Sequence, residues 1–310
     1  MTVVATATFN LDLSEIVEEA FERCGSELRT GYDLRTARRS LNLLFADWAN
    51  RGINMWTIEQ GQIPLVQGIN TYALPVDTVD LIEHVIRTNP GVQNTQADLT
   101  ISRISVDTYA TIPNKLQQAR PIQVWINRQT GQTNPTTVVL TANVSSTATT
   151  IDVSNAALLA STGFINLDSE TIYYANVTDN QLINCARGQN GTTATSHLVA
   201  TTVYVYNLPS INVWPTPDQG TVSAPYYTFV YWRLRRIHDA GNGVNTMDIP
   251  FRFLPCLIAG LAYYLALKIP GADVRLQILK QQYDEVWDLA SSEDREKAPI
   301  RFVPRKMFIT

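Results

Sequence analysis

The chain has 310 residues, of which 45% are hydrophobic and 17% charged, and its formal net charge is −4. This composition is typical of a globular protein with roughly two or three cores, and its slight acidity argues against a protein whose main task is to grip nucleic acid. It still allows a protein past which DNA slides, because tight phosphate binding would hinder that movement.

Three cysteines, far apart and without a CxxC pair, favour neither a disulfide framework nor a zinc site, and fit reduced, intracellular assembly. The first residues, MTVVATATFNLDLSEIVEEAF, lack the basic region ahead of an apolar stretch that marks a signal peptide. We therefore expect no cofactor, no metal site and no secretion.

Residues 1–54 predict two helices. Asp12 with Glu15 forms a capping box, and Gly25 is placed as the residue that ends the first helix. Asp33 can cap the second, whose apolar residues recur at steps of three and four. Arginines on this helix predict a solvated face and not a DNA-binding patch, because Asp47 and nearby acidic residues lie between them and break up the positive charge.

Residues 55–133 and 208–248 change to a period of two, with short apolar runs broken by glycine and proline, and predict the two parts of a central β-region. Residues 134–207 between them are rich in Thr, Ser, Asn and Ala and carry few charges. Their short β-branched runs predict a small antiparallel β-domain, inserted at a loop tip of the central region.

Residues 249–294 are helical again. Within them, residues 253–270 read FLPCLIAGLAYYLALKIP, with Lys268 as the one charge. This run is too short for a membrane span, and a helix that is apolar all round belongs in a protein core. An amphipathic partner covers only one side, so we expect other helices or a second copy of the chain to cover the rest, and a repeated subunit is the more economical of these two. The residues expected to provide this subunit packing are Leu257, Leu261, Tyr264, Leu265 and Trp48.

Asp273 can cap a last helix, after which residues 295–310 read as an extended, basic arm in which two prolines forbid a regular helix. Its alternating apolar residues favour docking on a neighbouring protein over contact with DNA phosphates. Helices at both ends and strands between them predict an α+β fold, in which the N- and C-terminal helices form one bundle from which the β-region projects.

Asp168 and Glu170 form the best pair of chemically active candidates, because residues two apart in a strand point to the same face and could bind a cation or act as acid and base. The simpler interpretation is that both carboxylates are solvent-exposed side chains of the strand without a chemical role, because Ca²⁺ needs many oxygen ligands. The nearby run RGQNGTT lacks the GK[ST] ending of a phosphate loop and is better explained by a turn. The three histidines lie in separate segments, outside any metal-ligand spacing. We expect no catalytic residues and no enzyme.

The helical stretches LDLSEIVEEAFERCG, RSLNLLFADWANRGINMW and DIPFRFLPCLIAGLAYYLALKIPGADVRLQILKQQYDEVWDL, with the strands around YALP and WPTP, resemble the head-to-tail adaptors of short-tailed bacteriophages, the tail accessory factor family. The resemblance implies a dodecameric ring in the neck of the virion, assembled in the host cytoplasm. Such a ring docks under the portal protein, continues the channel for double-stranded DNA and offers its lower surface to the tail nozzle. By position, the portal-binding residues of the arm would be Arg301, Phe302, Val303, Pro304, Arg305, Lys306 and Met307.

Two other functions stay open. The segment 134–207 is similar to small β-domains that decorate phage virion proteins, and it could contact tail fibres, tailspikes or the capsid. It could also make the protein a carbohydrate-binding or host-adhesion tail protein. A cell-wall hydrolase that uses Asp168 and Glu170 is the third hypothesis, and neither of these alternatives has a motif behind it.

Overall fold

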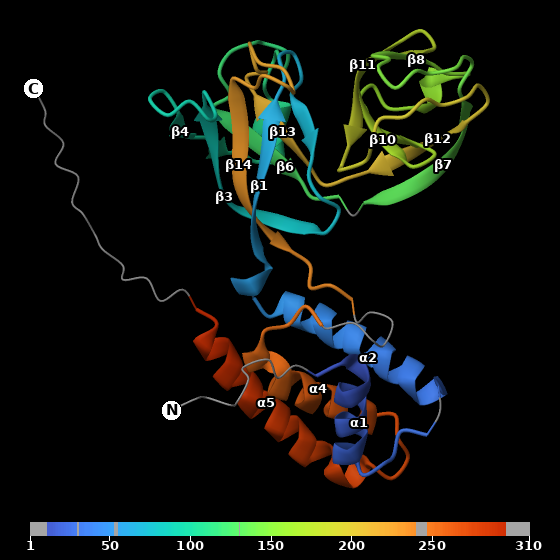
Figure 1. The fold of residues 1–310 in the computed structure, drawn as a ribbon, viewed down its shortest axis with the longest axis vertical. Helices are drawn as coiled ribbons and strands as arrows, with labels where there is room; N and C mark the ends of the chain where they lie inside the picture. Colours follow the sequence, from blue (N-terminus) through green and yellow to red (C-terminus); the bar gives the residue numbers. More distant parts are fainter. Residues whose placement is uncertain (1–10, 30, 53–54, 130, 240–246, 296–310) are drawn as a thin grey trace, which may run out of the picture. The chain divides into compact units, whose positions relative to one another are not determined.

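The computed structural model describes residues 11–29, 31–52, 55–129, 131–239 and 247–295. The chain is an α+β protein that divides into two compact units. The helical unit contains residues 1–57 and 237–310, and the β unit contains residues 58–236 (Figure 1). Both ends of the chain therefore belong to the helical unit, and the β unit is inserted between them in the sequence.

The helical unit contains the helices α1 (Leu13–Cys24), α2 (Gly31–Asn50), α4 (Leu254–Ala266) and α5 (Leu276–Glu293). Short 3-10 turns lie at η1 (Met55–Thr57), η3 (Phe251–Phe253) and η4 (Asp273–Arg275). Buried side chains from all four helices form one core. Residues from both ends of the chain thus complete a common hydrophobic interior.

The first helix ends as predicted, whereas two predicted caps are wrong. Asp12 and Glu15 form the reciprocal capping box, and Gly25 has the left-handed φ of 77° that closes α1. Helix α2 already begins at Gly31, so Asp33 lies within its first turn. Asp273 makes no capping side-chain bond, because a 3-10 turn precedes α5 there.

Helix α4 is buried by helices of its own chain. It packs against α1, α2 and α5, and ten of its residues are buried. Cys24 of α1 donates a hydrogen bond from its thiol to the carbonyl oxygen of Ala262, at 3.1 Å. Gly260 lets α2 and α5 approach, since a Cβ there would lie 2.9 Å from side-chain atoms of Leu44 and Tyr283. A second copy is therefore not needed to cover α4. Within the described ranges, every helix is too short or too polar to cross a membrane.

Two four-stranded sheets form the central part of the β unit. The first has the order β1 (Ile58–Leu65), β14 (Tyr227–Arg235), β3 (Thr78–Thr88) and β4 (Ala97–Thr100). The second has the order β2 (Thr71–Ala73), β13 (Ser210–Trp214), β6 (Gln123–Asn127) and β5 (Ser102–Arg103). Their buried side chains share one core, and the short helix α3 (Val106–Ala110) follows β5. All pairs are antiparallel except β5 with β6.

A six-stranded antiparallel sheet forms the remainder of the β unit, the β-domain. Its order is β7 (Gln132–Val139), β12 (Thr202–Asn207), β9 (Gly163–Leu167), β10 (Glu170–Thr178), β11 (Gln181–Gln189) and β8 (Thr150–Asp152), with a 3-10 turn η2 at Ala156–Leu158. Its aliphatic side chains form a core of their own. The alternation of β-branched and polar residues that the sequence shows is what such a half-buried sheet requires.

The β-domain also contacts the central sheets through a small apolar cluster. Phe164, Tyr173 and Leu208 are buried there, with Ile69 and Ala73 packed against them. The Tyr173 hydroxyl accepts a hydrogen bond from Thr162 Oγ1 at 3.1 Å. These contacts attach the β-domain to the central sheets by side-chain packing as well as by the chain connections.

Candidate functional site

Four of the five residues predicted for subunit packing lie in the core of a single helical unit. Leu257, Leu261, Leu265 and Trp48 are all buried there, and Tyr264 is half-buried against the same core. Trp48 also donates its indole N–H to the Tyr283 hydroxyl, at 2.9 Å. Side chains that are already buried within one chain are not available to a second copy. The predicted portal-binding residues of the arm lie outside the described residues.

The strongest polar cluster of the β-domain is centred on the carboxylate of Glu170, which has no solvent exposure. Arg187 donates to both of its oxygens, at 2.8 Å and 2.7 Å. The backbone N–H groups of Gly188 and Thr195 donate to it at 2.9 Å each, and His197 Nε2 lies 2.9 Å from it. A buried charge with this many partners holds the surrounding loops in one arrangement.

These contacts decide the ionisation of Glu170. Burial alone would raise the pKa of this carboxyl, but the bonds from Arg187, Thr195, His197 and Gly188 outweigh it and lower the pKa to about 2. A general acid needs a pKa near the working pH and access to substrate. Glu170 has neither, so its geometry does not fit the acid or base of the hydrolase hypothesis.

The prediction of a solvated strand surface is wrong for Glu170 and holds only for Asp168, which lies 64% exposed in the turn between β9 and β10. Asp168 has a left-handed φ of 52°, and its Oδ2 lies 2.8 Å from His197 Nδ1. The sequence analysis missed Arg187 and His197, which come from distant segments. One signal was present in the sequence: Arg187 is a lone cation in a segment poor in charge, which is the pattern of a buried ion pair.

A shallow pocket of about 540 Å³ opens beside Asp168. It is lined by Thr133, Asn166, Asp168, Thr201, Thr202 and Tyr204. Its hydroxyl, amide and carboxylate groups can exchange hydrogen bonds with a polyhydroxylated ligand, and the half-exposed ring of Tyr204 can cover an apolar face. Within the run RGQNGTT, the first three residues end β11, and the predicted turn is confined to Asn190 and Gly191, after which the Thr192 N–H donates to the Gln189 carbonyl oxygen.

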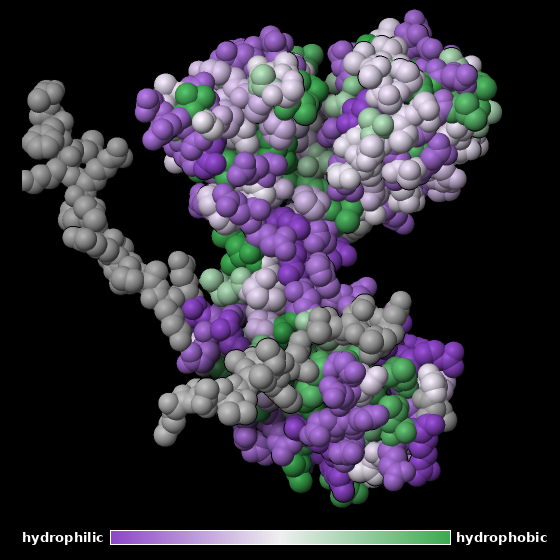
Figure 2. Space-filling model, in the orientation of Figure 1, coloured by the Kyte–Doolittle hydropathy of each residue, from purple (hydrophilic) through white to green (hydrophobic). Residues whose placement is uncertain are grey.

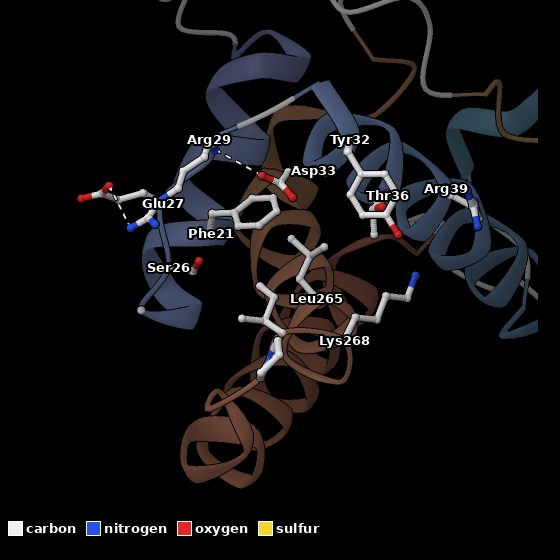
Figure 3. A pocket seen from close by; sticks show the side chains of 13 residues that line it. Phe21, Ser26, Glu27, Arg29, Tyr32, Asp33, Thr36, Arg39, Leu265 and Lys268 are labelled. Atoms are coloured by element: carbon white, nitrogen blue, oxygen red, sulfur yellow. Dashed lines mark hydrogen bonds and ion pairs between the residues drawn. The ribbon is translucent and has the colours of Figure 1, made fainter.

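A larger pocket, of about 710 Å³, lies on the helical unit between the end of α1, the start of α2 and the end of α4 (Figure 3). Apolar side chains including Phe21 and Leu265 line it. Arg29 donates its backbone N–H to Asp33. Lys268 bonds the hydroxyl of Ser40 at 2.8 Å. The lining combines apolar walls with charged groups of both signs, because Glu27, paired with Arg29, and Asp33 lie there together with Arg39 and Lys268.

In the part of the chain that the structure describes, no group of three or more His, Cys, Asp or Glu side chains is arranged to hold a metal ion. The chain matches no protein-family model and no curated protein.

Proposed function

We propose that the protein is a structural adaptor of a bacteriophage virion. In this function, identical subunits form a ring beneath the portal protein, continue the DNA channel and dock the tail nozzle. The arm that follows α5 joins the ring to the portal. Double-stranded DNA passes through the ring without sequence-specific binding, and the position of the protein is the neck between capsid and tail.

The observation that carries the proposal is the helical unit built from both ends of the chain, with the β unit inserted between them. The helical stretches on which the resemblance to the adaptor family rests lie in this one unit. The helical unit also exposes large apolar side chains although its core is complete, among them Leu267 and Val274. Figure 2 shows such apolar patches among polar residues over the helical unit. Exposed apolar side chains such as these offer area that assembly with another subunit can remove from water.

Native mass spectrometry tests the proposal. The purified full chain is measured alone and after mixing with the portal protein of the same virus. A saturated complex with many copies of the chain on one portal ring is expected. A chain that is folded and does not associate with the portal contradicts the proposal. A variant that ends at Ala298 is expected to lose portal binding and to keep its thermal unfolding temperature.

A second candidate function is glycan binding by the β-domain, which the pocket beside Asp168 favours. Carboxylate and amide groups next to an aromatic ring are the usual partners of sugar hydroxyls and of the apolar face of a sugar ring. Calorimetric titration of the full chain with oligosaccharides from the host surface tests it. Binding that Tyr204→Ala abolishes supports this function, and no binding at millimolar sugar excludes it.

A further inference from the structure

The outward side of α2 carries an unusual stripe of four residues. Tyr32, Thr36, Arg39 and Leu43 follow one another at steps of four, three and four, so they lie on one face of the helix. Tyr32 is 66% exposed and Leu43 54% exposed. The buried residues of α2 lie on the other side of the helix, against the core. We call these four residues the α2 stripe.

Helix α5 carries a stripe with the same spacing. Ile278, Gln282, Glu285 and Leu289 also follow one another at steps of four, three and four. Ile278 is 62% exposed and Leu289 69% exposed, while the buried residues of α5 face the core. We call these four residues the α5 stripe.

The two stripes are complementary in chemistry as well as in spacing. Each has a large apolar residue at both ends, and the third position is Arg39 in one and Glu285 in the other. The exposed Arg35 lies beside the α2 stripe and the exposed Asp288 beside the α5 stripe, each with the charge of its stripe, and the exposed Lys280 of α5 lies farther round that helix. Among the described residues, the side chains of Arg35, Arg39 and Asp288 have no hydrogen bond or ion pair assigned to them, and Glu285 accepts a hydrogen bond from Gln281.

The α2 stripe also borders the pocket of the helical unit. Tyr32, Thr36 and Arg39 form one wall of it, and Figure 3 shows them on α2 opposite Leu265 and Lys268. A helix laid along the α2 stripe could therefore insert an apolar side chain beside an apolar wall, with its acids close to Arg39 and Lys268. Ile278 and Leu289 on α5 are side chains of this kind.

We propose that the α2 stripe of one copy binds the α5 stripe of a second copy of the chain. Both stripes are exposed in the single chain, so they do not cover each other within it. Opposite charges set the register of such a contact, and its apolar ends remove exposed surface from water. Because the two surfaces differ, the contact is head-to-tail, and repetition closes a ring or continues as a filament. This inference rests on the proposed function in one respect, since it supplies the subunit contact of the adaptor ring.

Charge reversal in the full chain tests the contact without the portal. Sedimentation velocity at low salt measures self-association of the chain as its concentration rises. We expect Arg39→Glu and Glu285→Arg each to weaken self-association by at least about 10-fold, because like charges then face one another. The double variant is expected to recover it. An equal mixture of the two single variants is also expected to recover it, because each interface in an alternating assembly then pairs opposite charges.

Arg120→Glu makes the same change of charge on the β unit and is the matched control, which is expected to leave association unchanged. Circular dichroism checks that each variant is folded. A chain that stays monomeric up to about 1 mM at low salt overturns the inference, as does association that ignores both reversals. Loss of portal binding in Arg39→Glu without any self-association of the native chain also overturns it, and assigns the α2 stripe to another protein. Self-association through the stripes without portal binding would refute the adaptor function and leave this contact standing.

Discussion

Glu170→Gln removes the charge at the centre of the β-domain and keeps the shape of the side chain. The native pKa of Glu170 is about 2 and its ordinary value is 4.5. A depressed pKa contributes stability that is fully present above the unfolded value and is lost as the pH falls through the folded one. The lowered pKa of Glu170 therefore contributes about 3 kcal/mol to the free energy of unfolding at neutral pH, and about half of that at pH 3.

Hydrogen exchange followed by mass spectrometry measures this difference locally. The expected result at pH 7 is about 100-fold lower protection of segments within residues 163–200 in the variant than in the native chain, and about 10-fold lower at pH 3. The N–H groups of Gly188 and Thr195, which donate to Glu170, lie in this region. Segments of the helical unit are expected to keep their protection.

Asp152→Asn is the matched control, because this surface carboxylate of β8 accepts a hydrogen bond from Gln181 and is replaced by an amide in the same way. Its effect is expected within about 0.5 kcal/mol. Equal protection of the native chain and Glu170→Gln at pH 7 would show that the buried carboxylate does not stabilise the loops. A difference that is the same at pH 7 and pH 3 would refute the assigned pKa.

Three further predictions concern the helical unit and the thiols. Gly260→Ala is expected to destabilise the helical unit by about 1–3 kcal/mol, because the added Cβ clashes with Leu44 and Tyr283. Gly31→Ala is the control, since a Cβ there meets open space. Thermal unfolding measures the stability of both variants. Trp48→Phe removes the bond to the Tyr283 hydroxyl and is expected to cost about 2–3 kcal/mol by the same assay, so an unchanged unfolding temperature contradicts it. Burial raises the pKa of all three cysteine thiols, so iodoacetamide at pH 7.5 is expected to leave them unmodified in the native chain and to label them in urea.

Local signals were enough to predict the main helices and the segments that form strands. The capping box at Asp12 and the left-handed Gly25 satisfy the backbone of α1 within a few residues, so no distant contact is needed to place them. The apolar run around α4 requires burial whatever surrounds it. The period of two in the strand segments likewise follows from the alternation of side chains across a sheet.

Contacts between distant segments decided the rest. The sequence favoured a second copy of the chain as the cover of α4, but the packing of α1, α2 and α5 shows that its own chain covers it. The sequence placed Glu170 on a solvated strand, but Arg187 and His197 reach it from positions 17 and 27 residues away. Burial and ionisation depend on the groups that surround a side chain in space, and the order of residues along the chain does not contain that information. The amino-acid sequence by itself thus determined the main helices and the β-character of the segments between them, whereas the tertiary structure decided which polar groups are buried together and which apolar faces stay exposed.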